Sequence, residues 1–248
     1  MKRYRDSVIQ TVSGVLAAAD RRPGTVRPYF HDEPTLRAAA RARDHVLYRA
    51  ERDVWPAATA EPDHGPHREW RVDRVSYPAG DLPSGELNRS TGHWNPDDQW
   101  EIFQVDRGEV VLLARLPGPG RPTELIRCGP GSRVTLLPGS WHLTYVWHGP
   151  AVVTNAYNIT HGHQVGPEKY FTRPTLRCGL RRDGSRVTVF RDPTDPLQDA
   201  GAPVWRVAVD QAPRLPPLES LFAGTGRATR SVSTLEDHCA RLEQRIGR

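Results

Sequence analysis

Lysine is almost absent from this sequence of 248 residues. Lys2 and Lys169 are the two lysines, so nearly all of the 34 basic residues are arginines. The formal net charge of +5 is therefore weak evidence for a nucleic-acid partner. The sequence also contains no run of basic residues and no basic stripe with interleaved aromatic side chains, which argues against nucleic-acid binding.

Cysteine is also scarce, and Cys128, Cys178 and Cys239 lie far apart in the chain. An odd number at these spacings excludes a disulfide framework and a zinc knuckle, and it favours a reducing cytoplasm. The first 20 residues imitate a secretion signal, but Asp6 lies in the basic part and Gln10 interrupts the apolar part. Long apolar runs are missing, so we expect no membrane span and a cytoplasmic location.

Turn residues are common, with 23 prolines and 21 glycines. From Trp70 to about Phe190, short apolar runs alternate with turn sequences such as "DRG", "GPGS" and "HGP". Strands at this spacing, without helices between them, are typical of an all-β sandwich or barrel. We predict a β domain with an N-terminal strand and helix segment over residues 1–194, followed by a proline-rich linker and a C-terminal helix over residues 195–248.

Two stretches outside the strands are predicted to be helical. The stretch "DEPTLRAAARARDHVLYRA" has Asp32 as its cap and Pro34 in its first turn. The stretch "STLEDHCARLEQRIGR" begins with Ser233 and Glu236 at the spacing of a capping box. Its apolar residues fall on one face, so we expect this helix to dock on the barrel or on a partner subunit.

A candidate metal-binding pattern lies in "GHWNPDDQWEIFQVDRGE", residues 92–109. His93 and Asn95 are two residues apart, so on a strand they face the same side. Glu101 follows, and six residues separate it from Gly108. Later in the chain, "LLPGSWH" places His142 on a strand just after a Pro-Gly turn. A barrel that pairs these segments would gather His93, Asn95, Glu101 and His142 in its interior.

Together these segments resemble, in the right order, the two motifs of the cupin superfamily. The first motif has Gly, then His-x-His, Glu, six residues and Gly, whereas the second has Gly, Pro-Gly and His. Gly92 begins the first match, and the second runs through Gly131, Pro138 and Gly139 to His142. The resemblance implies a cupin double-stranded β-helix, or jelly-roll barrel, with flanking helices. It also implies a homodimer, because exposed edge strands favour pairing between subunits.

Within the cupins, the sequence resembles the cupin-type glucose-6-phosphate isomerases from about Gly14 to Phe190. The resemblance includes "RPYFHDE", "DHVLY", "VSYPAG", "STGH" and "YNITHGHQVG". It places the metal ligands at His93, Glu101 and His142, and it implies one divalent ion of Fe, Mn, Ni or Zn. Asn95 stands where the family has a second histidine. Because an amide oxygen binds transition metals more weakly than imidazole, Asn95 could be a fourth ligand, a substrate contact or neither.

The resemblance also implies a pocket for a sugar phosphate. Arg74 and Ser90 stand where the family typically has threonine. Serine keeps a hydroxyl donor, and arginine could strengthen an anion site. The implied substrate contacts are Tyr48, Arg74, Ser90, Gly92 and Tyr157.

Two further positions bear on the chemistry that the resemblance implies. His163 matches a family histidine near the pocket and is a candidate catalytic residue, together with Glu101 as base. The pair His161 and His163 could instead be a second metal pair or plain surface. Phe103 stands where the family usually has tyrosine, which removes one hydroxyl group.

Aldose–ketose isomerisation moves a proton or a hydride between adjacent carbons, and the proton route needs a base and a group that stabilises negative charge. A divalent metal on two imidazoles and a carboxylate can polarise both sugar oxygens. The resemblance therefore implies a metal-dependent isomerase for a small sugar or sugar phosphate. One alternative is a divergent cupin enzyme of a specialised biosynthetic pathway that acts on another small polar metabolite, which Asn95 and Phe103 favour. The other is a non-catalytic small-molecule-binding cupin, against which Glu101 argues.

Overall fold

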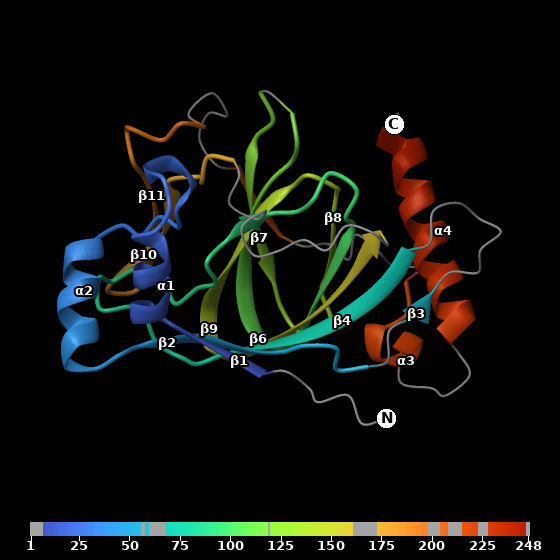
Figure 1. The fold of residues 1–248 in the computed structure, drawn as a ribbon, viewed down its shortest axis with the longest axis horizontal. Coiled ribbons are helices and arrows are strands. Elements are labelled where there is room, and N and C mark those ends of the chain that lie inside the picture. Colours follow the sequence, from blue (N-terminus) through green and yellow to red (C-terminus); the bar gives the residue numbers. More distant parts are fainter. Residues whose placement is uncertain are drawn as a thin grey trace.

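The computed structural model describes residues 7–55, 58–59, 68–118, 120–160, 173–197, 204–207, 215–222 and 228–246. Strands form a central barrel, with helices on two opposite sides of it (Figure 1). The strands are β1 (Ser7–Thr11), β2 (Val46–Glu51), β3 (Ala58–Thr59), β4 (Arg68–Tyr77), β5 (His93–Trp94), β6 (Glu101–Arg115), β7 (Thr123–Cys128), β8 (Arg133–Leu136), β9 (Trp141–Thr160), β10 (Cys178–Asp183), β11 (Arg186–Arg191) and β12 (Val204–Val207). The helices are α1 (Val12–Ala19), η1 (Gly24–Val26), α2 (Glu33–Ala42), α3 (Leu218–Phe222) and α4 (Ala228–Ile246).

Two long strands, β6 and β9, run through both faces of the barrel and pair with each other along their lengths. On the first face, the start of β6 pairs with β8, and the end of β9 pairs with β4, which leads on to β2 and β1. On the second face, the end of β6 pairs with β7, and the start of β9 pairs with β5. The result is two sheets that share strands and pack face to face around an apolar core. This mostly β, cupin-like fold confirms the predicted class.

Both shared strands change the side that they present to the barrel interior about halfway along. In β6, odd-numbered residues such as Glu101 face the interior in the first half, whereas even-numbered residues such as Leu112 do so in the second. The register of β6 on β9 shifts around Gly108, which has φ +76°. A Cβ atom at Gly108 would lie 2.5 Å from the carbonyl oxygen of Pro150, so only glycine fits this close approach.

The outer faces of both sheets are covered by other parts of the chain. Helices α3 and α4 cover the first face, where Leu218 and Leu235 pack against Trp70 and Ile102. The hairpin of β10 and β11 covers the second face through side chains such as Leu180. Helices α1 and α2 pack beside β2, on the side of the barrel opposite α4 (Figure 1). Strands β4, β6 and β9 are therefore apolar on both faces.

The prediction for the N-terminal helix is correct in its first part and wrong in its second. Asp32 caps α2, and its Oδ1 accepts a hydrogen bond from the backbone nitrogen of Thr35 at 3.1 Å. However, α2 ends at Ala42, and "VLYRAE" forms strand β2. The buried residues Leu47 and Ala50 lie on opposite faces of this strand, because Leu47 packs with α1 and α2 whereas Ala50 packs in the barrel core.

The capping box predicted at Ser233 and Glu236 is wrong, because α4 begins at Ala228 and both residues lie inside the helix. Glu236 has a different role, since its Oε1 accepts a hydrogen bond from the indole nitrogen of Trp70 at 2.7 Å. Leu235 is fully buried against the barrel. Helix α4 therefore docks on the barrel, which is one of the two positions expected for it.

The described parts of the predicted C-terminal region all contact the barrel. Strand β12 extends the second sheet by pairing in parallel with β7. The backbone nitrogen of Leu218, at the start of α3, donates to the side chain of Gln104 at 3.0 Å. Among the residues that the structure describes, no helix is both long enough and apolar enough to cross a membrane.

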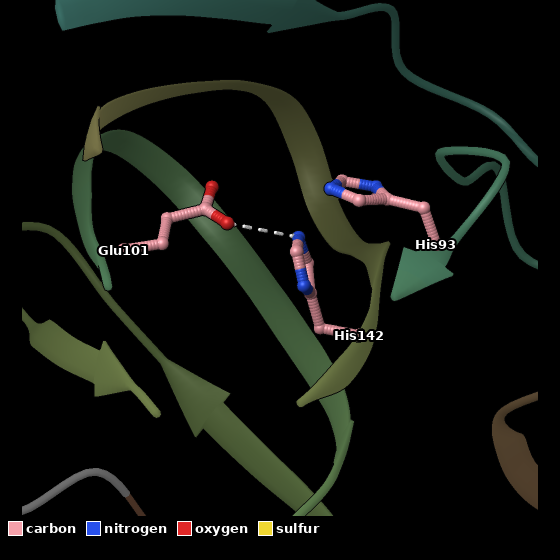
Figure 2. A group of neighbouring side chains, drawn as sticks. All are labelled: His93, Glu101 and His142. Carbon is pink, nitrogen blue, oxygen red and sulfur yellow. Dashed lines mark ion pairs between the residues drawn. The ribbon is translucent and has the colours of Figure 1, made fainter. Parts of the chain in front are cut away.

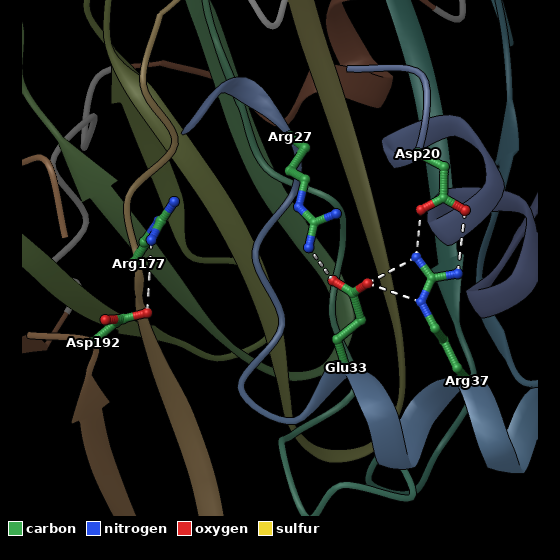
Figure 3. Close-up of polar contacts among 6 residues, drawn as sticks. All are labelled: Asp20, Arg27, Glu33, Arg37, Arg177 and Asp192. Carbon is green, nitrogen blue, oxygen red and sulfur yellow. Dashed lines mark hydrogen bonds and ion pairs between the residues drawn. The ribbon is translucent and has the colours of Figure 1, made fainter. Parts of the chain in front are cut away.

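A network of ion pairs holds α1 and α2 together beside the barrel (Figure 3). Arg37 on α2 donates to Asp20 at 2.5 Å and to Glu33 at 2.9 Å. Glu33 also accepts a hydrogen bond from Arg27 at 2.7 Å. Exposed ion pairs contribute little one by one, but several that share partners restrict the position of the elements that carry them. The network thereby fixes α1, which forms one wall of the cavity described below.

Candidate metal centre

Three side chains from different strands meet inside the barrel (Figure 2). His93 on β5 and His142 on β9 are direct partners in the strand register, and their ring centroids lie 4.3 Å apart. Nε2 of His142 lies 3.4 Å from Oε2 of Glu101, which is the first residue of β6. One ligand atom of each residue lies within 4.8 Å of those of the other two. The two sequence motifs therefore converge on one cluster.

Burial controls the protonation of this cluster. Burial, with a smaller effect of His142, lowers the pKa of His93 to about 3, and burial lowers the pKa of His142 to about 4. Both imidazoles are therefore neutral at neutral pH, and each has a lone pair for a ligand. Burial raises the pKa of Glu101 above its usual value, because the carboxylate has lost water.

The three residues fit a divalent metal ion. Oε2 of Glu101 and Nδ1 of His142 are buried and have no hydrogen-bond partner. A buried carboxylate oxygen without a partner is costly, and a cation beside it would supply the missing counter-charge. Two neutral imidazoles and one carboxylate are a donor set that suits Fe, Mn, Ni or Zn. His93, Glu101 and His142 are thus the residues that would hold the ion.

Asn95 lies beside the cluster and is 2% exposed. Its backbone nitrogen donates to the carbonyl oxygen of Ser140 at 2.7 Å, which fixes the chain just after β5. Its side chain lies close to both His93 and Glu101. Neither amide atom completes a hydrogen bond. Buried amides are nearly always paired, so an unpaired one suggests a missing ligand. The amide oxygen of Asn95 is therefore available as a fourth metal ligand.

The cluster opens into a cavity of about 540 Å³, which is large enough for a small metabolite. Its walls come from β2, β4, β9 and α1 as well as from the strands that carry the candidate ligands. Hydroxyl, guanidinium and carboxylate groups line part of it, beside apolar side chains such as Val15 and Val75. The lining includes Tyr48, Arg52, Arg71, Asp73, Ser90 and Tyr157.

The structure brings three of the five expected substrate contacts to the cavity: Tyr48, Ser90 and Tyr157. Gly92 has a different role. Its φ is +71°, and a Cβ atom there would lie 2.8 Å from the ring of Trp141. Glycine at this position lets the backbone pass close to Trp141, directly before His93.

The fifth expected contact, Arg74, does not line the cavity. Its guanidinium lies 5.5 Å from the ring centroid of Trp55, and its Nε lies 4.0 Å from Asp106. Arg71 and Asp73, at odd-numbered positions of the same strand, line the cavity in its place. Side chains of a strand alternate between its two faces, so Arg74 lies on the face opposite to Arg71 and Asp73.

Arg52 and Arg71, two of the arginines that line the cavity, were not predicted from the sequence. In β4, apolar residues lie on both faces, since Trp70 packs under α4 while Tyr77 packs inside the barrel. The apolar pattern therefore does not show which face is the interior. One signal was present, because Arg52 follows Tyr48 by four residues and thus shares its face of an extended segment.

The remaining expectations concern Phe103 and two histidines. Phe103 is 1% exposed and belongs to the apolar core of the barrel, so it brings no polar group to the cavity. His161 and His163 lie outside the described residues. The candidate catalytic role of His163 therefore stays a prediction from resemblance.

No family model matches this chain, and no curated protein matches it. Solved structures that resemble it include an oxalate oxidase, with 16% identity over 36% of this chain and 41% of the other, and a TM-score of 0.30. KdgF from Halomonas sp. matches with 13% identity over 46% of this chain and 81% of the other, with a TM-score of 0.31. The cupin domain of Schizosaccharomyces pombe Cnp3 matches with 10% identity over 45% of this chain and 64% of the other, with a TM-score of 0.29. The chain spans less than half the length of the oxalate oxidase. Similarity at this level assigns neither a family nor an activity.

Proposed function

We propose that this chain is a metal-dependent cupin enzyme that isomerises a small polyhydroxy metabolite with an anionic group, and that sugar phosphates are the first candidates. One observation carries this proposal. The His93–Glu101–His142 cluster, with its unpaired buried carboxylate oxygen, opens into a cavity lined by hydroxyl and guanidinium groups. A ligand set with an open side next to a polar cavity is typical of a catalytic metal site and not of a closed structural one.

When bound, a divalent ion would polarise the carbonyl and hydroxyl oxygens of such a substrate. Glu101 would take a proton from one carbon atom and return it to the neighbouring one, which interconverts an aldose and a ketose. Burial raises the pKa of Glu101, so its carboxylate is a stronger base than an exposed one. His93 and His142 stay neutral because burial lowers the pKa of each, and they carry no proton that would compete with the ion.

Hydroxyl groups on the cavity walls would orient the substrate. Burial raises the pKa of Tyr48, so its phenol keeps its proton and can donate a hydrogen bond. Tyr157 lies on β9 and Ser90 just before β5, and both line the cavity. Ser90 Oγ accepts a hydrogen bond from the backbone nitrogen of Thr144 at 3.0 Å, which fixes the position of this hydroxyl on the cavity wall.

A second candidate function is a metal-dependent reaction on another small polar metabolite of a specialised pathway. Asn95 favours it, because an amide oxygen is a weaker ligand than an imidazole and would change the field that a metal ion experiences. Phe103 favours it as well, since its side chain is part of the apolar core and offers no hydroxyl. The two candidates share the metal site and differ in substrate.

Metal analysis tests the shared part of the proposal. Protein reconstituted with Fe, Mn, Ni or Zn in turn should retain about one ion per chain after dialysis. The Glu101→Gln variant should retain little or none, whereas Glu109→Gln, which removes an exposed carboxylate from the same strand, should bind like the wild type. Equal metal content in the two variants, or no retained metal in the wild type, would exclude the site and favour a non-catalytic binding protein.

Incubation with fructose 6-phosphate in heavy water tests the reaction. We expect glucose 6-phosphate to form with deuterium at the carbon that exchanges its proton, because Glu101 shares its proton with solvent. Glu101→Gln should slow formation at least a hundredfold, roughly the effect of losing a general base. Metal binding without turnover or deuterium incorporation would reject the isomerase and leave the second candidate.

A further inference from the structure

Arg52 and Arg71 both line the cavity next to the candidate metal site. Arg52 comes directly after β2, and Arg71 lies on β4, the strand that pairs with β2. Tyr157 on β9 is the direct register partner of Arg71, and its side chain lines the same cavity as both arginines.

A buried carboxylate, Asp73, fixes the position of Arg52. Asp73 is 2% exposed, and its Oδ2 accepts a hydrogen bond from Nη1 of Arg52. Its other oxygen accepts one from the backbone nitrogen of Asp53 at 3.1 Å. Asp53 has φ +50°, a conformation that is uncommon outside glycine and that aspartate tolerates better than most residues. One carboxylate thus holds both the side chain and the backbone corner beside the cavity, and strained corners of this kind concentrate at ligand sites.

Both guanidinium groups have donors that the described residues do not use. Arg52 donates through Nη1 to Asp73, and Arg71 donates through Nε to Glu69 at 3.0 Å. A guanidinium has five N–H groups in a planar fork, whose geometry matches the oxygens of a phosphate or carboxylate. The two side chains are 48% and 36% exposed, so a molecule in the cavity can reach the remaining donors.

The charge of the cavity also favours an anion. Among the residues that the structure describes, three arginines line it, Arg22, Arg52 and Arg71, together with three carboxylates, Asp53, Asp73 and Glu101. The formal charges of these side chains cancel. A divalent ion at the candidate metal site would therefore leave two positive charges in excess, which a small anion would neutralise.

We propose that Arg52 and Arg71 form a subsite for the anionic group of a small polyhydroxy ligand, and that Asp73 is the positioning residue of Arg52. The orientation of the ligand, with its anionic group on the arginines and its other oxygens toward Glu101, rests on the proposed function. The subsite itself needs no turnover. The arginine expected from sequence to contact phosphate, Arg74, lies on the other face of β4 and is outside this subsite.

Calorimetric titration of the metal-reconstituted protein tests the subsite with three probes: fructose 6-phosphate, gluconate and fructose. We expect at least one of the two anions to bind more tightly than fructose, and the tighter one identifies phosphate or carboxylate as the preferred group. Arg52→Ala and Arg71→Ala should each weaken binding of that anion by about tenfold to a hundredfold, the effect of a hydrogen bond to a charged group, and should leave fructose unchanged.

Two arginines of the same strands are matched controls. Arg49→Ala on β2 and Arg74→Ala on β4 remove the same charge from positions outside the cavity lining. Both should bind the anion within about twofold of the wild type, since a screened surface charge has little effect. The subsite is excluded if Arg74→Ala or Arg49→Ala weakens anion binding as much as Arg52→Ala does, or if neither cavity variant weakens it.

A double-mutant cycle tests the positioning role of Asp73. Asp73→Asn should weaken anion binding, and the double variant Asp73→Asn/Arg52→Ala should bind no more weakly than Arg52→Ala alone. Additive losses would show that Asp73 acts independently of Arg52 and would overturn the positioning role. Arg52→Lys, which keeps the charge and most of the volume, should bind more weakly than the wild type because it loses the planar fork. Wild-type affinity in this variant would contradict recognition by the fork.

The Glu101→Gln variant distinguishes a failure of the subsite from a failure of the proposed function. We expect it to lose metal and turnover while the Arg52-dependent difference between the preferred anion and fructose persists. Absence of turnover in the wild type, with arginine-dependent anion binding intact, would reject the isomerase and keep the subsite. Turnover that does not depend on Arg52 or Arg71 would reject the subsite and keep the isomerase.

Discussion

Two clusters of buried polar side chains lie only three residues apart on β9, one around Tyr145 and one around His142. In the first, Oε1 of Glu86 accepts hydrogen bonds from Arg89 at 2.6 Å and from the hydroxyl of Tyr145 at 2.9 Å. All three residues are at most 1% exposed. The second oxygen of Glu86 accepts a hydrogen bond from the backbone nitrogen of His31 at 3.3 Å. This cluster is complete without any other molecule.

The cluster around His142 is also largely buried, but it is incomplete. Oε2 of Glu101, Nδ1 of His142 and both amide atoms of Asn95 have no hydrogen-bond partner. Buried polar groups that satisfy one another contribute to the fold, whereas unpaired ones need a ligand to offset their lost hydration. The comparison teaches that pairing, and not burial, separates a structural cluster from a candidate functional one.

The largest effect that this comparison predicts is on Arg89. Arg89→Met should lower the free energy of unfolding by about 3–5 kcal/mol, because it leaves the carboxylate of Glu86 buried without its counter-charge. Urea denaturation at neutral pH measures this change. The control is His142→Ala in metal-free protein, which should cost about 1 kcal/mol. Equal losses in the two variants would contradict the distinction between the clusters.

Metal addition should complete the second cluster. At a free-ion concentration of a hundred times the dissociation constant, the ion that binds best should stabilise the wild type by about 2.7 kcal/mol. Thermal unfolding with and without the ion measures the gain. Glu101→Gln should show almost none of it, while Tyr145→Phe should show all of it. A gain that survives in Glu101→Gln would place the ion somewhere else.

Deletion of one polar group from each cluster gives a smaller contrast. Tyr145→Phe removes one donor from Glu86 and should cost about 1–3 kcal/mol, the typical effect of an unpaired buried group. Asn95→Leu removes an amide that has no partner, so in metal-free protein it should cost less than about 1 kcal/mol or even stabilise. Urea denaturation of both variants without metal measures the difference. A larger cost for Asn95→Leu would mean that the amide is paired in solution.

The dependence of stability on pH gives the smallest expected difference. Burial lowers the pKa of His142 to about 4, so between pH 6.5 and about 4 the unfolded chain binds a proton that the folded chain does not. Stability therefore falls as the pH falls through this window, by up to about 1.4 kcal/mol per pH unit for this histidine. Burial raises the pKa of Glu101, which has the opposite effect on stability. The stability that this carboxyl group contributes at low pH is lost as the pH rises above its pKa in the unfolded chain.

The Glu101→Gln background isolates the histidine contribution. In this background, metal-free protein should lose stability between pH 6.5 and about 4, and a second substitution, His142→Asn, should make the slope shallower. Urea midpoints at several pH values measure both slopes. Identical slopes would mean that His142 has the same pKa in the folded and unfolded chains.

The sequence was sufficient for most of the strands and for the cluster of His93, Glu101 and His142, because both follow from residue spacing. Strand periodicity and turn residues indicated the β class, and the motif spacing indicated His93, Glu101 and His142. The sequence was insufficient where contacts between distant segments determine which face of a strand is buried and where a strand ends. The outward direction of Arg74 was not predictable, because α4 packs on an outer face of β4 that is as apolar as the inner face. Likewise, "WEIFQV" and "GEVVLLARL" form one strand, because β9 pairs with both.

The register shift at Gly108 explains why the number of residues between Glu101 and Gly108 in the first motif matters. Side chains alternate along a strand, so the number of residues from Glu101 to the shift sets which of two phases reaches the interior. With one residue fewer, the strands could still pair, but Glu101 and Ile102 would exchange sides. The carboxylate would then lie under α3 and α4, where Ile102 now packs, and an isoleucine would face the two histidines. The length of this segment, independent of most of its residues, thus keeps a charge inside the barrel and an apolar side chain outside it.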